Sequence, residues 1–148
     1  MSEHEGVIVF SEMYDLMLEM LGKGREIADE LHTSLATVLI GFNVQGKADE
    51  LIKYGADKVY LVDNQALEHF QVEAYLSVLH NLATSYKPEI ILIGSTRNGK
   101  PLAARLATRL EAGCVPDCNR LSVDEKRRLI GERITYGGNA AAKIAFKA

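Results

Sequence analysis

The sequence has few of the features that stabilise small secreted or membrane-bound proteins. It contains no tryptophan, three prolines and two cysteines, Cys114 and Cys118. Two cysteines are too few for a disulfide framework or a closed zinc site, which favours a reducing compartment. No apolar stretch approaches the roughly 20 residues of a membrane helix, and the acidic segment Met1–Gly6 precedes an apolar run too short for a signal peptide. We therefore expect a cytoplasmic protein without membrane insertion.

A strong charge of either sign is also missing. The chain has 17 basic and 20 acidic residues, for a net charge of −3. Such a small net charge does not hold a protein on nucleic acid or anionic lipid by its long-range field, so we expect no nucleic-acid partner. The length of 148 residues fits one domain, and no repeat or Pro/Gly/Ser-rich linker interrupts it. Residues 1–148 are therefore predicted to form a single domain.

Short apolar runs alternate with amphipathic segments from the start of the chain to Leu110. The predicted strands are Val7–Phe10, Leu35–Gly41, Lys58–Val62 and Glu89–Gly94, and the predicted helices are 13–31, 47–54, 72–86 and 101–110. Apolar strands separated by helices indicate a mainly parallel sheet that is covered on both faces. Right-handed crossovers then give a three-layer α/β/α sandwich. Gly24 lies on the apolar stripe of the first helix, which predicts close packing there against the sheet.

The last part of the chain has a different pattern. Leu129–Tyr136 and Ala140–Phe146 alternate between apolar and polar residues on either side of Gly137–Asn139. The residues between the two segments suit the positive φ angles of a hairpin turn. We expect an antiparallel C-terminal hairpin that extends the parallel sheet.

The polar turn after Glu89–Gly94 is the first candidate for chemistry. The segment Gly94–Lys100 has the Gly-x4-Gly-Lys form of a P-loop, but Pro101 replaces the hydroxyl residue that would hold Mg²⁺. Proline also lacks the backbone N–H that a phosphate cradle uses. The sequence therefore does not predict phosphoryl transfer at this turn, and a plain strand-to-helix connection is the simpler interpretation.

The same turn nevertheless has a suitable place for binding a ligand. Parallel α/β sheets bind ligands beyond the carboxyl ends of their strands. The predicted cofactor-contacting positions are Gly94, Ser95, Thr96 and Asn98. These four residues are assigned from their position in the predicted sheet alone.

Basic side chains gather beside this turn. Arg97 and Lys100 lie in it, and Arg105 and Arg109 share one face of the following helix at a spacing of i, i+4. They could meet a phosphate or an acidic partner. A solvated helix face is the alternative interpretation, and the sequence favours it.

Catalytic and metal-binding patterns are not recognisable. The histidines His4, His32, His69 and His80 have no ligand-like spacing among themselves or to the cysteines. Three residues separate Cys114 from Cys118, not two as in thioredoxin-like motifs, so we predict packed thiols and not a redox pair. Asp117 has no visible acid–base partner, so a capping or turn role is expected for it. We predict no catalytic residue and no metal site.

Several segments taken together resemble the electron transfer flavoprotein α-subunit family. They are Gly55–Asp63, Lys87–Thr96, Gly99–Leu110 and Arg133–Ala140, with Asp117 at the position of an aspartate that precedes a short strand in that family. The segments follow the family's order and span nearly the whole chain. The combination is specific, although each segment alone is not.

The resemblance implies a fold, a partner and a cofactor. The fold is that of the α subunit's N-terminal domain, which is similar to adenine nucleotide α-hydrolases, and the partner is a β-type subunit. Such dimers use FAD to carry electrons from acyl-CoA and other dehydrogenases to a membrane quinone reductase. In the family the flavin is held chiefly by a second α domain, which the sequence up to Ala148 does not include. A natural split, a stand-alone relative and a fragment of a longer protein are all open explanations. FAD is therefore expected in the family complex but not on this chain alone.

Three functions follow as hypotheses. The first is a non-catalytic flavoprotein component that pairs with a β-type subunit and a separate FAD domain. The second is a stand-alone adenine-nucleotide-binding module that uses the turn after Gly94 with Arg97, Lys100 and Arg105. The third, a hydrolase or transferase of adenylated substrates, rests on fold analogy alone. Association of the chain with itself is left open.

Overall fold

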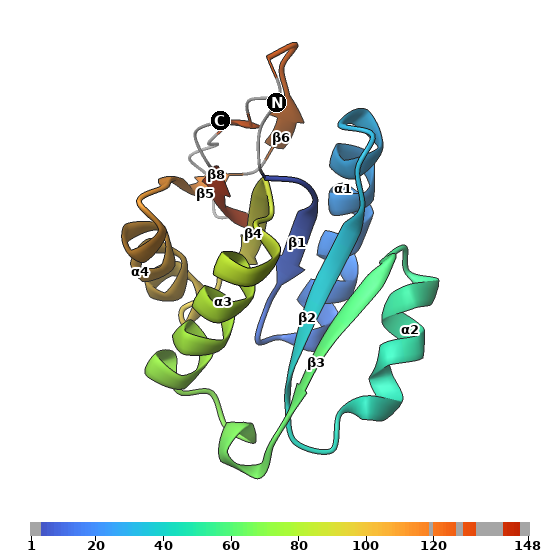
Figure 1. Cartoon of the computed structure of the whole chain (residues 1–148), viewed down its shortest axis with the longest axis vertical. Helices are drawn as coiled ribbons and strands as arrows, with labels where there is room; N and C mark the ends of the chain where they lie inside the picture. Colours follow the sequence, from blue (N-terminus) through green and yellow to red (C-terminus); the bar gives the residue numbers. More distant parts are fainter. Residues whose placement is uncertain (1–3, 119, 127–128, 133–140, 146–148) are drawn as a thin grey trace.

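Strands and helices alternate in the computed structural model, which describes residues 4–118, 120–126, 129–132 and 141–145 (Figure 1). The first strands are β1 (Val7–Phe10), β2 (Leu35–Gly41), β3 (Lys58–Asp63) and β4 (Ile90–Gly94). The helices are α1 (Tyr14–Glu30), α2 (Ala48–Lys53), α3 (Val72–Tyr86) and α4 (Gly99–Leu110), with short 3-10 turns at Gln45–Lys47 and Gln65–Leu67. The later strands are β5 (Gly113–Cys118), β6 (Arg120–Val123), β7 (Leu129–Glu132) and β8 (Ala141–Ala145). The predicted strands and helices up to Leu110 are confirmed within two residues at each end.

Local sequence explains where several helices stop. Gly55 follows α2 with φ of 121°, a conformation that glycine adopts without strain. The residue after α3, Lys87, lies in the left-handed region and directly precedes Pro88, which cannot continue a helix. The residue after α4, Glu111, is also left-handed, with φ of 54°.

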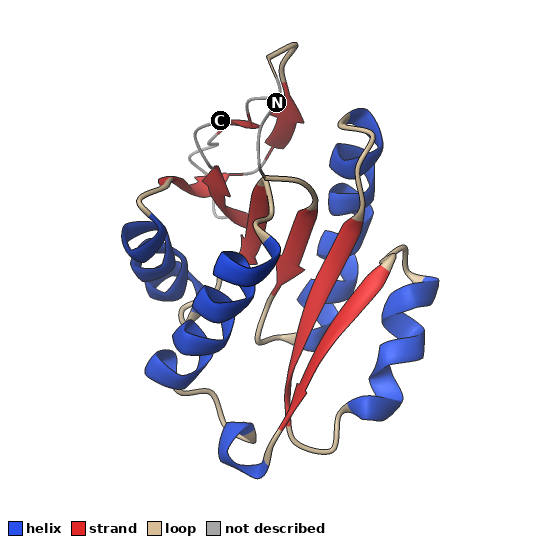
Figure 2. Cartoon of the chain, in the orientation of Figure 1, coloured by secondary structure: helices blue, strands red, loops and turns tan. Residues whose placement is uncertain are grey.

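Four parallel strands form one side of the main sheet, in the order β3-β2-β1-β4. Val7 of β1 pairs with Leu35 on one side and with Ile90 on the other. Helices cover both faces of these strands (Figure 2). The predicted parallel sheet with flanking helices is therefore confirmed.

The sheet continues beyond β4 with strands of the opposite direction. Strand β8 pairs antiparallel with β4, with Ile144 opposite Ile91, and β5 pairs antiparallel with β8. Strand β7 pairs with β6 in a separate two-stranded sheet, with Glu132 opposite Arg120. The turn of the predicted C-terminal hairpin, residues 133–140, lies outside the described residues, so the pairing across that turn stays a prediction.

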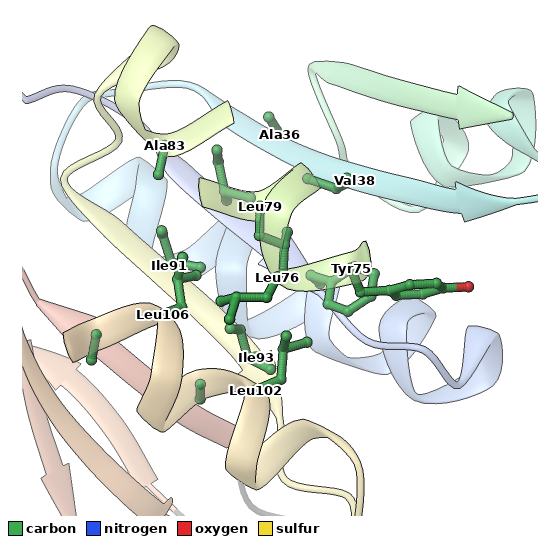
Figure 3. Close-up of a cluster of buried hydrophobic side chains, with 14 of the residues drawn as sticks. Ala36, Val38, Tyr75, Leu76, Leu79, Ala83, Ile91, Ile93, Leu102 and Leu106 are labelled. Carbon is green, nitrogen blue, oxygen red and sulfur yellow. The ribbon is translucent and has the colours of Figure 1, made fainter. Parts of the chain in front are cut away.

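The core occupies both faces of the sheet because successive strand residues point in opposite directions. Ile8 and Phe10 contribute to the cluster under α3 and α4, whereas Val7 and Val9 contribute to the cluster under α1. In Figure 3, side chains of α3 and α4 meet those of the central strands, as Leu76 and Leu106 do near Ile91. All four residues of β1 are buried. The uninterrupted apolar strands of the sequence thus correspond to a sheet covered on both sides.

Gly24 is a point of close approach between α1 and the sheet. A Cβ at this position would lie 2.8 Å from Val9 Cγ2 and 2.9 Å from Leu35 Cδ1. Real Cβ atoms do not approach neighbouring atoms so closely, so any larger residue would force the Val9 and Leu35 side chains, or the helix itself, to shift. The predicted close packing at Gly24 is confirmed.

A polar network joins α1 to the amino ends of β2 and β3. Arg25 Nη1 donates to the Gly55 carbonyl oxygen at 2.9 Å and to Asp57 Oδ2 at 3.1 Å, and its guanidinium also pairs with Asp29. Asp57 Oδ2 accepts a further hydrogen bond from the Leu35 N–H at 2.8 Å. The Leu35 N–H and the Arg25 guanidinium together lower the pKa of Asp57. We call Arg25, Asp57 and the Leu35 N–H the amino-end network.

Candidate functional site

The candidate site lies at the topological switch point of the sheet, which is the place where the chain reverses the direction in which it adds strands. From β1 the chain moves outward through β2 and β3, and it then returns to place β4 on the other side of β1. The carboxyl ends of β1 and β4 are therefore adjacent, and this is the position at which open α/β sheets bind their ligands. The residues that follow these strands begin at Ser11 and Ser95.

The turn between β4 and α4 is too tight for a side chain at Gly99, where α4 begins. A Cβ on Gly99 would lie 1.9 Å from the Gly94 carbonyl oxygen, so residue 99 must be glycine if the turn is to keep this shape. A Cβ on Gly94 would lie 2.7 Å from Ser11 Oγ. The two glycines thus permit close contact, within the turn and between β4 and the end of β1.

Glu12 and Thr96 connect the two loops. Thr96 Oγ1 lies 2.8 Å from Glu12 Oε1 and 2.7 Å from Oε2, and it accepts a hydrogen bond from the Gly99 N–H at 2.8 Å. Ser11 Oγ donates weakly to Glu12 at 3.4 Å and accepts from the Met13 N–H at 3.1 Å. We call Ser11, Glu12, Thr96 and the Gly99 N–H the switch-point cluster.

The four residues predicted to contact a cofactor have different environments. Gly94 is the buried last residue of β4, Ser95 and Thr96 are half-buried, and Asn98 is exposed. Asn98 precedes α4, but its side chain makes no capping hydrogen bond. The structure brings Thr96 together with Glu12 and gives Thr96 the capping role instead. Cofactor contact by these four residues stays a prediction.

Backbone donors of the turn bond within the chain. The Thr96 N–H donates to the Gly94 carbonyl oxygen at 2.9 Å, and the Lys100 N–H donates to the Thr96 carbonyl oxygen at 3.0 Å. A P-loop instead directs such N–H groups toward a bound phosphate. The turn therefore differs from a P-loop in hydrogen bonding as well as in the proline at position 101.

Sequence reasoning missed Ser11 and Glu12. Their signal was present, because two polar residues directly follow the buried strand β1, at the same edge of the sheet as the turn after β4. The contact between Glu12 and Thr96 joins residues that are 84 positions apart. Only the strand order places them together.

The basic residues near the turn divide into two groups. Arg97 and Lys100 are exposed on the turn, whereas Arg105 forms a salt bridge with Glu73 of α3. Arg109 also lies near Glu73, with its Nη2 3.5 Å from Oε2. An open groove of about 370 Å³ lies between α3 and α4, lined by Glu73, Leu76, Ala104, Arg105, Thr108 and Arg109. The predicted shared face of Arg105 and Arg109 is confirmed, but an acidic residue of the chain already engages it.

Tyr14 flanks the switch-point cluster at the start of α1. Its hydroxyl donates to Glu50 Oε1 at 2.6 Å, and Lys47 Nζ lies 4.6 Å from the centre of its ring. Burial and the Glu50 carboxylate raise the pKa of Tyr14 above its ordinary value. These contacts fasten α1 to α2 at the carboxyl end of the sheet.

Metal and membrane sites have little support in the part of the chain that the structure describes. No group of three or more His, Cys, Asp or Glu side chains there could hold a metal ion. Cys114 is half-buried in β5. None of the described helices has both the length and the apolar character needed to span a membrane.

Comparison with known proteins identifies the family. A family model described as the electron transfer flavoprotein domain matches residues 9–148. The chain belongs to the electron transfer flavoprotein family. Electron transfer flavoprotein subunit alpha of Clostridium acetobutylicum is 41% identical to this chain over 149 residues. This similarity confirms the resemblance to the α subunit. That alignment covers 97% of this chain and 44% of the relative.

Other relatives of this flavoprotein-family chain carry different names. Protein FixB of Rhizobium meliloti is 38% identical, over 96% of this chain and 43% of the relative. The lactate dehydrogenase (NAD(+),ferredoxin) subunit LctC of Acetobacterium woodii is 37% identical, over 97% of this chain and 35% of that protein. The chain therefore spans less than half the length of these relatives.

Proposed function

We propose that this chain is the scaffold part of an α-type electron transfer flavoprotein in the cytoplasm. It pairs with a β-type subunit and with an FAD domain, and the complex carries electrons from dehydrogenases to a respiratory acceptor. The observation that carries this proposal is the family match over residues 9–148, with a relative named electron transfer flavoprotein subunit alpha at 41% identity. The chain itself acts as a carrier component and not as an enzyme.

The geometry of the switch-point cluster supports a scaffold role. The Thr96 hydroxyl donates to Glu12 and accepts from Gly99, and neighbouring backbone N–H groups bond to carbonyl oxygens of the same turn. These bonds fasten β1, β4 and α4 to one another. A site whose donors are engaged in this way stabilises the domain and offers few groups to a ligand.

FAD fits poorly at this position. Its diphosphate would lie beside the Glu12 carboxylate if it bound at the switch point in the manner of other α/β sheets. Like charges at short range oppose such binding. We therefore assign the flavin to the FAD domain of the complex, where it supplies the electron-carrying chemistry, and we derive no step that uses FAD on this chain.

The second candidate function is a stand-alone adenine-nucleotide-binding module. It is favoured by the exposed Arg97 and Lys100 on the turn that follows β4. It would use the predicted contacts at Gly94, Ser95, Thr96 and Asn98. The Glu12 carboxylate counts against it, so it remains the weaker proposal.

Co-expression tests the first proposal. The tagged chain is produced with a β-type subunit and an FAD domain, captured by its tag, and analysed by native mass spectrometry and flavin absorbance. We expect one complex that contains all three polypeptides and one flavin. The matched control omits only this chain, and a flavin-loaded complex that forms equally well in that control would remove the proposal.

A further inference from the structure

We infer that the negative charge of the Glu12 carboxylate keeps nucleotide phosphates away from the switch point of this domain. Glu12 is the second residue after the buried β1, and Thr96 connects it to the first turn of α4. The inference deepens the proposed scaffold function, because it gives a reason why the domain would leave nucleotide binding to its partners. It concerns the properties of this chain alone.

The first reason for this inference is the position of the Glu12 carboxylate. In sheets of this topology, phosphates bind beyond the strands at the switch point and at the start of the following helix. Thr96 Oγ1 accepts from the N–H of Gly99, the first residue of α4, and donates to the Glu12 carboxylate. A carboxylate of the chain thus already occupies the neighbourhood in which a ligand phosphate would be expected.

The second reason is that the hydroxyl hydrogens of Thr96 and Ser11 are already donated to Glu12. A threonine hydroxyl has a single hydrogen to donate, and Thr96 directs it to Glu12. Ser11 also donates to Glu12, at 3.4 Å. A phosphate entering here would have to compete with Glu12 for both hydroxyl hydrogens.

The third reason is the negative charge of Glu12. Within the described ranges, no salt bridge reaches Glu12, so no cation in those ranges neutralises it directly. The Glu12 carboxylate would repel the negative charge of a phosphate bound beside it. Removing the Glu12 charge would leave Arg97, which is exposed on the same turn, as a cation for the phosphate. We expect at least a ten-fold gain in affinity for AMP.

Ligand titration of three variants tests the inference. Glu12→Ala removes the carboxylate, and Glu12→Gln removes the charge but keeps an oxygen that can accept from Thr96. Glu19→Gln is the matched control, because Glu19 is exposed on α1 and also carries one negative charge. Melting temperature is followed with AMP and with inorganic phosphate up to about 10 mM, against potassium chloride of equal ionic strength, since a bound ligand raises the melting temperature by linkage.

The expected result separates the variants. AMP should raise the melting temperature of Glu12→Ala and Glu12→Gln by about 2–4 °C, and it should leave wild type and Glu19→Gln at the value measured in chloride. Wild-type protein that binds AMP as tightly as the Glu12 variants would overturn the inference, and so would folded Glu12→Gln that responds like Glu19→Gln. Circular dichroism establishes the fold of each variant first. None of these results depends on subunit pairing, so failure here leaves the proposed function intact.

Discussion

Two polar clusters lie at opposite ends of the same sheet, and they handle charge differently. In the amino-end network, the Asp57 carboxylate meets the Arg25 guanidinium at 3.1 Å and the Leu35 N–H at 2.8 Å. In the switch-point cluster, the Glu12 carboxylate meets the hydroxyl of Thr96 at 2.7 Å and, more weakly, that of Ser11. One carboxylate has a cationic partner, and the other is held by neutral donors.

The difference separates a structural role from a functional one. A paired carboxylate at the amino ends of the strands joins elements of the fold and leaves little net charge behind. Among the described residues the Glu12 carboxylate has no salt bridge, and it lies at the carboxyl ends of the strands, where such sheets bind ligands. We therefore expect changes at the amino end to alter stability and changes of the Glu12 charge to alter ligand preference.

The largest effect is expected for Gly99→Ala, which breaks the switch-point cluster. Its Cβ would lie 1.9 Å from the Gly94 carbonyl oxygen and 3.0 Å from Thr96 Oγ1. Because backbone must move to relieve the contact, we expect the free energy of unfolding to fall by about 3 kcal/mol or more. Urea denaturation followed by circular dichroism measures this value. A loss below about 1 kcal/mol would show that the turn relaxes easily.

A smaller loss is expected for Thr96→Val, which removes the hydroxyl but nearly keeps the volume. The Gly99 N–H would lose its acceptor and Glu12 its closest donor, so we expect a loss of about 2 kcal/mol. Thr96→Ser keeps the hydroxyl and is the matched control, with a change within about 0.5 kcal/mol. Equal losses in the two variants would mean that the methyl group, and not the hydroxyl, determines stability at this position.

At the amino end, Asp57→Asn should cost about 1 kcal/mol at neutral pH, because both groups of the ion pair are partly exposed. The pKa of Asp57 in the folded state is lowered from its ordinary value of 3.8. The stabilisation is therefore fully present above that value and is lost as the pH falls through the lower folded-state pKa. Urea denaturation of both proteins from neutral to acidic pH should show the difference shrinking only in the acidic range. A difference that is independent of pH would contradict the assigned ion pair.

The smallest effect, and one of opposite sign, is expected for Gly22→Ala, which lies outside both clusters. Gly22 is exposed in α1, and a Cβ there would have no heavy atom within 4 Å. Alanine loses less backbone entropy than glycine in a helix, so we expect a stabilisation of about 0.5–1 kcal/mol. Gly24→Ala, two residues further along the same helix, should instead destabilise through its contacts with Val9 and Leu35. Thermal melts of the two variants should therefore shift in opposite directions.

The parallel part of the fold could be predicted from the sequence because its signals are local. Strands such as Leu35–Gly41 are apolar throughout, and the helix Val72–Tyr86 shows apolar residues at helical spacing. The strand β5 and the pairing of β6 with β7 were not predicted. Gly113–Cys118 contains a proline and lacks a long apolar run, and its partner β8 comes later in the chain. Such pairing depends on neighbours that the local pattern does not contain.

The candidate site could be predicted only in part. The turn after β4 was found from its place at the carboxyl end of a buried strand, and Thr96 proved to be central to it. Glu12 was missed because its contact with Thr96 depends on β1 and β4 being neighbours in the sheet. Sequence alone gives the residues that follow each strand but not the order of the strands.

An NMR titration of the isotope-labelled chain tests directly whether this domain binds a partner subunit and binds no nucleotide at its switch point. AMP is added first, to about 10 mM, followed by the β-type subunit. We expect AMP to leave the amide resonances of Thr96, Gly99 and Lys100 unchanged. The subunit should shift or broaden resonances elsewhere on the chain. Shifts of those three amides with AMP, together with no response to the subunit, would contradict it.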